Sequence, residues 1–177
     1  YALNHKENTR PMFTKSARFY DDLYRAKDYA GESARLHALI QQHKRSGGAA
    51  LLDVACGAGG HLSYLRPQYA LEGLDLDDTM LAVACERFPD IPFHCADMAD
   101  FALGRKFDVV TCLFGSIGYV RTVERLRQML ANCARHLQPG GVLILEPWLT
   151  PDQFHPGAVY AVFVDQPDLK IARISVS

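Results

Sequence analysis

One ten-residue stretch of this sequence joins an apolar run, a carboxylate and a glycine-rich turn. It reads Leu51-Leu-Asp-Val-Ala-Cys-Gly-Ala-Gly-Gly60. Gly57 and Gly59 have no Cβ atom and can adopt positive φ, so a ligand can lie against bare backbone. A turn of this kind between a strand and a helix is typical of a nucleotide-cofactor loop. Asp53 would repel the pyrophosphate of a dinucleotide but attract a cation. The stretch therefore favours S-adenosylmethionine, whose ammonium and sulfonium are both positive.

Two more carboxylates follow apolar runs further along the chain. Asp75 ends Gly73-Leu-Asp75-Leu76, where a carboxylate can accept hydrogen bonds from both ribose hydroxyls. Asp97 lies in Cys95-Ala-Asp97-Met98. Its carboxylate can accept from the adenine amine, and Met98 offers an apolar wall and a backbone N–H. Because ligands bind at the carboxyl ends of parallel strands, we expect the three carboxylates at one edge of a sheet.

The elements that must position these residues alternate along the chain. Two N-terminal helices are expected, one over 16–29 and one capped by Ser33, with Leu36, Leu39 and Ile40 inward, that ends at Gly47-Gly48. Strands are then predicted at 50–54, 69–74, 91–95, 107–113 and 141–146, and helices at 60–66, 78–88 and 121–137, the last ending before Pro139-Gly140-Gly141. This alternation predicts an α/β fold, a doubly wound (Rossmann-like), mostly parallel sheet with helices on both faces.

The C-terminal part of the chain predicts a different element. Two apolar runs, 158–164 and 169–176, flank Gln166-Pro167-Asp168 and indicate a β-hairpin outside the main sheet. We therefore expect a flexible arm over 1–15, a cofactor-binding domain over 16–148 and a hairpin extension over 149–177. The extension is expected to cover the acceptor pocket or to contact a second subunit in a homodimer.

Size and composition exclude several classes of function. The 177 residues, 49% of them hydrophobic, fit one globular domain. With a formal net charge of −1 and no long basic cluster, a nucleic-acid substrate is disfavoured. No apolar run approaches the ~20 residues that a membrane helix needs. The five cysteines are scattered and form no CxxC pair, which predicts reduced core residues, no metal and a cytoplasmic location.

The motifs, taken in order, resemble those of the class I S-adenosylmethionine-dependent methyltransferases. The resemblance covers 16–147 and rests on the loop after Asp53, on Asp75, on Asp97-Met98 and on Leu137–Gly141. That family usually has glycine where Ala55 stands, and we expect alanine to be accommodated there at negative φ. The family's sheet usually has seven strands. The two that complete it are expected to be missing from this chain, which stops at Ser177.

A closer resemblance lies within that family. Tyr20-Asp-Asp-Leu-Tyr24, Lys27-Asp-Tyr29, Ser116-Ile-Gly and Glu146-Pro-Trp148 are similar to motifs of N,N-dimethyltransferases that act on nucleotide-linked amino sugars. The resemblance implies that Tyr20 and Tyr29 close over the methionine end of the cofactor, and that Glu146 lines the acceptor pocket. The sugar enzymes carry histidine where this chain has Tyr119.

Methyl transfer from a sulfonium is an in-line displacement that depends on positioning and desolvation. An amine acceptor must be neutral when it attacks, and a carboxylate or a phenol can orient it and relay its proton. Our catalytic candidates are Glu146 and Tyr119. The predicted cofactor-binding residues are Tyr20, Tyr29, Asp53, Ala55, Gly57, Gly59, Asp75, Leu76, Asp97, Met98 and Leu113.

The sequence therefore predicts methyl transfer to a small-molecule acceptor, with the amine nitrogen of an amino sugar as the leading acceptor. Three alternatives stay open. An O-methyltransferase acting on a hydroxylated metabolite would share every cofactor residue. A non-catalytic S-adenosylmethionine-binding protein would lack a complete acceptor pocket. An NAD-linked reductase would need GxGxxG, but the third glycine, counted from Gly57, would fall on Leu62.

Overall fold

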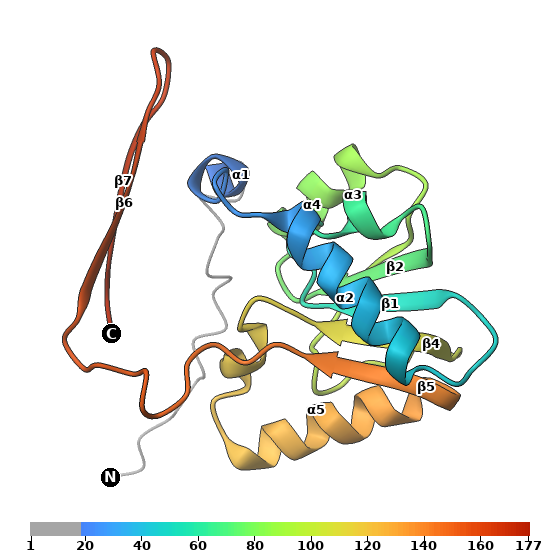
Figure 1. The fold of residues 1–177 in the computed structure, drawn as a ribbon. Coiled ribbons are helices and arrows are strands. Elements are labelled where there is room, and N and C mark those ends of the chain that lie inside the picture. Colours follow the sequence, from blue (N-terminus) through green and yellow to red (C-terminus); the bar gives the residue numbers. More distant parts are fainter. Residues whose placement is uncertain (1–18) are drawn as a thin grey trace, which may run out of the picture.

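The computed structural model describes residues 19–177, so the predicted arm over 1–15 lies outside the described residues. A parallel sheet of five strands in the order β3-β2-β1-β4-β5 forms the centre of the molecule (Figure 1). Its strands are β1 (Ala50–Val54), β2 (Ala70–Asp75), β3 (Phe93–Cys95), β4 (Phe107–Cys112) and β5 (Leu137–Leu145). The α/β prediction is confirmed.

Helices cover both faces of this sheet. The helices of the described residues are α1 (Tyr20–Leu23), α2 (Tyr29–His43), α3 (Leu62–Leu65), α4 (Asp78–Arg87), the 3-10 helix η2 (Ser116–Val120) and α5 (Val123–Arg135). Successive strand residues point to opposite faces. Leu51 therefore packs with Leu36 and Ile40 of α2, whereas its neighbour Leu52 packs with the α5 side chains. The two hydrophobic cores hold α2 and α5 on different sides of the strands (Figure 1).

The start of α2 differs from the expectation. Asp28 caps this helix, because its carboxylate accepts a hydrogen bond from the Gly31 N–H at 2.9 Å. Ser33 lies inside the helix and is buried, so it is not the cap. The expected inward position of Leu39 is also wrong, since 45% of this residue is exposed. Of the helix predicted over 16–29, the described part contains only the four-residue α1.

The junction of α5 and β5 is a second correction. The helix ends at Arg135, and Pro139-Gly140-Gly141 lies inside β5 rather than before it. Gly140 adopts φ 78°, and the β4–β5 register shifts between Phe107 and Val109. The strand therefore absorbs this segment as a bulge, for which glycine is suited.

The hairpin consists of β6 (Val159–Asp165) and β7 (Lys170–Val176), which within residues 19–177 pair only with each other. This confirms the predicted hairpin outside the main sheet. In Figure 1 it stands beside α1, apart from the five-stranded sheet. Arg173 of β7 donates to the Tyr24 hydroxyl just after α1, and Gln166 contacts Asp22 at 3.5 Å.

The cysteine prediction holds only in part. All five cysteines are free, and Cys112 and Cys133 are buried in the core. Cys85 and Cys95 are exposed, so they are not core residues. No helix within residues 19–177 is long and apolar enough to cross a bilayer.

Candidate functional site

The glycine-rich loop leaves the carboxyl end of β1, at the point where the strand order changes direction between β1 and β4. Ligands of open α/β sheets bind at this point. Two backbone hydrogen bonds shape the loop, from Cys56 N to Leu74 O at 3.0 Å and from Gly59 N to Cys56 O at 3.0 Å. Gly57 and Gly59 adopt φ of 55° and 78°, which glycine does without strain.

Ala55 departs from the expectation for this loop. It adopts φ 57° instead of a negative value. A non-glycine residue in the left-handed region is disfavoured by on the order of 1–2 kcal/mol. The backbone turn of this loop is therefore retained with alanine, but at a conformational cost that glycine would avoid.

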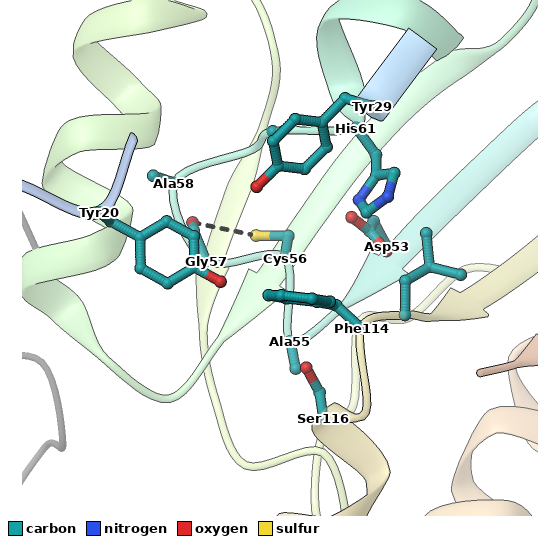
Figure 2. A pocket seen from close by; sticks show the side chains of 12 residues that line it. Tyr20, Tyr29, Asp53, Ala55, Cys56, Gly57, Ala58, His61, Phe114 and Ser116 are labelled. Atoms are coloured by element: carbon teal, nitrogen blue, oxygen red, sulfur yellow. Dashed lines mark hydrogen bonds between the residues drawn. The ribbon is translucent and has the colours of Figure 1, made fainter. Parts of the chain in front are cut away.

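A cleft opens over this loop. Figure 2 shows the rings of Tyr20, Tyr29 and Phe114 converging on the segment that contains Gly57. The cleft is lined by Tyr20, Tyr29, Asp53, Ala55, Cys56, Gly57, Ala58, Gly60, His61, Leu113, Phe114 and Ser116. Six of the predicted cofactor residues are thus brought together: Tyr20, Tyr29, Asp53, Ala55, Gly57 and Leu113.

Asp53 places a buried carboxylate in the wall of this cleft. Only 3% of the residue is exposed, and its Oδ1 accepts a hydrogen bond from the Thr111 hydroxyl at 2.8 Å. Burial raises the pKa of Asp53 to about 6, although His61 and Thr111 act to lower it. The ionised form is poorly solvated, so a bound cation would stabilise it.

Asp75 acts on the loop from the end of β2. Its Oδ2 accepts from the Gly57 N–H at 2.7 Å, and its Oδ1 accepts from the Asp77 N–H at 2.9 Å. Burial raises the pKa of Asp75, and these two backbone donors partly offset the effect. Asp75 does not line the cleft itself. An ionised carboxylate has about four acceptor positions, so Asp75 keeps acceptor capacity beyond its backbone donors, which the predicted ribose contact requires.

The predicted adenine residues are engaged with protein. Asp97 Oδ1 accepts from the Ala99 N–H at 2.8 Å, and Oδ2 is ion-paired with Arg125 of α5. Met98 packs against the core on the α5 side, and Leu76 is 62% exposed. Together with Gly59, these residues lie outside the lining of the cleft, so their cofactor contacts stay predictions.

Neither catalytic candidate lines the cleft. Tyr119 lies in η2 and is 46% exposed. Burial, together with nearby Tyr24, raises the pKa of its phenol, while Arg173 acts to lower it. Glu146 immediately follows β5, and its Oε2 accepts from the Phe114 N–H at 2.7 Å. The catalytic roles of both residues stay predictions.

A cluster of charged and polar side chains beside the cleft was not predicted from the sequence. The Lys27 ammonium lies 2.5 Å from Glu32, and Glu32 Oε2 lies 2.9 Å from His61 Nε2. Lys27 Nζ also lies 4.1 Å from the centroid of the Phe114 ring, and the His61 ring packs edge-on against Tyr29. The Lys-Asp-Tyr motif marked this region, but no sequence spacing brings Lys27 to Phe114.

These residues fit S-adenosylmethionine. The buried Asp53 carboxylate complements an ammonium, and the aromatic faces of Tyr20, Tyr29 and Phe114 attract a sulfonium through their π electrons. The glycine at position 57 leaves the backbone open to close approach. Among the described residues, no group of histidine, cysteine and carboxylate side chains is arranged to hold a metal ion.

Sequence comparison decides the family. The family described as "Methyltransferase domain" matches residues 51–141, from the start of β1 into β5. The chain belongs to this methyltransferase family. The chain is 42% identical over 164 residues to the dTDP-4-amino-2,3,4,6-tetradeoxy-D-glucose N,N-dimethyltransferase of Saccharopolyspora spinosa, covering 91% of this chain and 66% of the relative. It is 43% identical over 164 residues to the dTDP-3-amino-3,6-dideoxy-alpha-D-glucopyranose N,N-dimethyltransferase of Streptomyces fradiae, covering 91% and 64%. The chain thus spans about two thirds of the length of these relatives.

Solved structures agree with this assignment. The crystal structure of DesVI from Streptomyces venezuelae matches with a TM-score of 0.84 and 39% identity, over 99% of this chain and 71% of DesVI. CalS10, an amino pentose methyltransferase from Micromonospora echinaspora solved with S-adenosylmethionine bound, matches with a TM-score of 0.78 and 38% identity, over 97% and 71%. The predicted cofactor, S-adenosylmethionine, is confirmed for the family. The alternative of an NAD-linked reductase is therefore rejected.

Proposed function

We propose that this methyltransferase transfers the methyl group of S-adenosylmethionine to the amine nitrogen of a nucleotide-linked amino sugar. The observation that carries the proposal is the buried Asp53 carboxylate in an aromatic-lined cleft after β1. That site suits a sulfonium cofactor, and the chain belongs to a methyltransferase family. The relatives with 42% and 43% identity are named for dimethylation of dTDP-linked amino sugars.

Several of the cofactor residues then have proposed tasks. Asp53 binds the ammonium, Asp75 holds the Gly57 turn and accepts from the ribose, and Asp97 with Met98 meets the adenine. Tyr20 and Tyr29 cover the methionine end and exclude water. When bound, the cofactor supplies an electrophilic methyl group on a positive sulfur. Water exclusion matters because it keeps the sulfonium paired with fixed carboxylates and rings rather than with solvent.

On the acceptor side, we propose that Tyr119 orients the amine. A tyrosine phenol is ordinarily protonated at neutral pH, and burial raises the pKa of Tyr119 further. The phenol can therefore donate a hydrogen bond to the acceptor, or accept one from its N–H, without gaining charge. Glu146 immediately follows β5, and we propose that it also lines the pocket that binds the acceptor.

A paired acceptor experiment tests this function. The protein is incubated with S-adenosylmethionine and either a dTDP-linked amino deoxyhexose or the same dTDP-sugar with a hydroxyl in place of the amine. Formation of S-adenosylhomocysteine and the mass of the sugar nucleotide are followed. We expect turnover only with the amine, with products carrying one and then two methyl groups. Turnover with only the hydroxyl sugar would establish an O-methyltransferase. Binding of S-adenosylmethionine with turnover on neither would favour a non-catalytic role.

Two further properties are proposed for the whole protein. We propose a homodimer through the hairpin, because Val159, Phe163 and Ile174 on its strands are exposed. Light scattering of the protein and of Phe163→Glu checks it, since a dimer formed through this surface dissociates in the variant.

We also propose a cytoplasmic location, which the five free cysteines support. Fractionation of cells that produce the protein checks this location.

A further inference from the structure

The segment that follows β4 makes an unusual turn. Ser116 N donates to Leu113 O at 3.2 Å, and the two residues between them have positive φ, 55° at Phe114 and 70° at Gly115. Two successive positive φ values with this hydrogen bond define a type I′ turn. Glycine takes that conformation freely, but phenylalanine does not. The conformation of Phe114 therefore needs support from outside the turn.

Glu146 supplies that support from the end of the neighbouring strand. Its backbone N–H donates to Cys112 O at 3.0 Å, and its backbone oxygen accepts from Gly115 N at 3.2 Å. Its side chain adds a third contact, because Oε2 accepts from Phe114 N at 2.7 Å. The Leu113–Ser116 hydrogen bond does not use the Phe114 N–H. That hydrogen bond also leaves the Gly115 N–H over. Glu146 accepts from both groups, from Gly115 N with its backbone oxygen and from Phe114 N with its carboxylate.

The turn forms part of the cofactor cleft. Leu113, Phe114 and Ser116 all line it, and Figure 2 shows the Phe114 ring facing the glycine loop. The Phe114 ring packs edge-on against Tyr24, with centroids 5.0 Å apart, and lies under the Lys27 ammonium. If Phe114 left the positive-φ region, its ring would leave both contacts and the wall of the cleft.

We propose that Glu146 is a positioning residue, whose carboxylate holds the Phe114 N–H and thereby keeps the Leu113–Ser116 turn in the shape that forms the wall of the cofactor cleft. This role rests on the proposed function in one respect, because it assumes that the cleft binds the cofactor for methyl transfer. It differs from the proton relay that the sequence suggested. A relay needs an ionisable oxygen near the amine that receives the methyl group. The turn needs only an oxygen at this position that can accept a hydrogen bond.

Two substitutions at this position separate the roles. Glu146→Gln keeps an acceptor oxygen but cannot relay a proton, and Glu146→Ala removes both capacities. We expect Glu146→Ala to speed hydrogen exchange at the Phe114 amide and to weaken S-adenosylmethionine binding, each by on the order of tenfold. Glu146→Gln is expected to recover most of both losses. The matched control is Glu86→Ala, which removes an exposed carboxylate from α4 and should change neither readout.

A second variant keeps the test decisive if Glu146→Ala does not fold. Phe114→Gly accepts positive φ freely but removes the ring, so it should weaken cofactor binding by itself. In that background the turn no longer needs the carboxylate, so Glu146→Ala should fold and should cause no further loss of cofactor affinity, because the two residues act through one turn.

The proposal is overturned if the alanine and glutamine variants both keep normal amide exchange and cofactor affinity yet lose turnover equally. That result would return Glu146 to proton transfer. Absence of methylated product from the unmodified protein would instead refute the proposed function. The exchange and binding measurements would still decide the role of Glu146.

Discussion

Replacing Asp53 by asparagine measures the energetic cost of the charge in the cleft. Burial raises the pKa of Asp53 from 3.8 to about 6, against the lowering effects of His61 and Thr111. The difference is about two pH units, and each unit corresponds to about 1.4 kcal/mol. The ionised carboxylate therefore lowers the free energy of unfolding by roughly 3 kcal/mol at pH 7 in the absence of a ligand.

The direction in which stability changes with pH depends on which state, folded or unfolded, binds the Asp53 proton more tightly. Between the two pKa values, the folded protein holds the Asp53 proton more tightly than the unfolded chain does. Stability therefore falls as the pH rises through this window, and the full cost is present above pH ~6. Asparagine carries no charge and can still accept the Thr111 hydrogen bond. Without ligand, the free energy of unfolding of Asp53→Asn should be higher than that of the unmodified protein by about 3 kcal/mol at pH 7.5. The difference should be only about 1 kcal/mol at pH 4.5.

Urea unfolding at these two pH values is the assay. The matched control is Asp108→Asn, at a carboxylate that accepts from Gly48 N and Ala50 N. Burial opposes the charge of Asp108, but its loop donors outweigh burial and lower its pKa. This substitution should therefore destabilise the protein at pH 7.5. A less stable Asp53→Asn variant, or a stability gap that does not change with pH, would refute the reasoning about Asp53.

Three further predictions concern the glycine-rich loop after β1 and the turn after β4. Affinity for S-adenosylmethionine, measured by calorimetry, should rise as the pH increases through about 6, where Asp53 ionises, and then level off; a flat profile from pH 5 to 8 would contradict the Asp53–ammonium contact. Asp75→Ala should abolish cofactor binding, since it removes both the proposed ribose acceptor and the partner of Gly57 N; retained affinity would remove the ribose assignment. Gly115→Ala should lower the free energy of unfolding by at least about 1–2 kcal/mol, because φ is 70° and a Cβ there would lie 2.9 Å from Trp148 Cβ; an unchanged urea midpoint would show that the turn relaxes freely.

The sheet and the cofactor loop were predictable because their signals are local. Leu51 and Leu52 begin an apolar strand, and a glycine turn follows at once, so the strand–loop–helix order can be read directly from the chain. The same holds for Asp75 at the end of the next strand. Parallel pairing then places the ends of these strands at one edge, as the register between Asp53 and Gly73 shows.

Other features depend on exact backbone geometry or on contacts between distant residues, and the sequence pattern reveals neither. The positive φ of Ala55 reflects the path that the loop must take, which glycine composition alone does not reveal. Asp28 and Ser33 are both capping residue types, and only the turn geometry selects Asp28. The inclusion of Pro139-Gly140-Gly141 in β5 is set by pairing with β4. Likewise, the hydrogen bond from Phe114 to Glu146 joins two segments that meet only in the folded sheet.

The most direct test of the central claim is to follow an isotope-labelled methyl group. S-adenosylmethionine carrying a ¹³C-methyl group is incubated with the protein and a dTDP-linked amino deoxyhexose, and the product is examined by two-dimensional NMR. We predict that the labelled methyl carbon correlates across nitrogen with the sugar carbon that bears the amine, and that a second methyl group follows. Correlation of the label with an oxygen-bearing sugar carbon, or label that stays on the cofactor while the protein binds it, would contradict N-methylation.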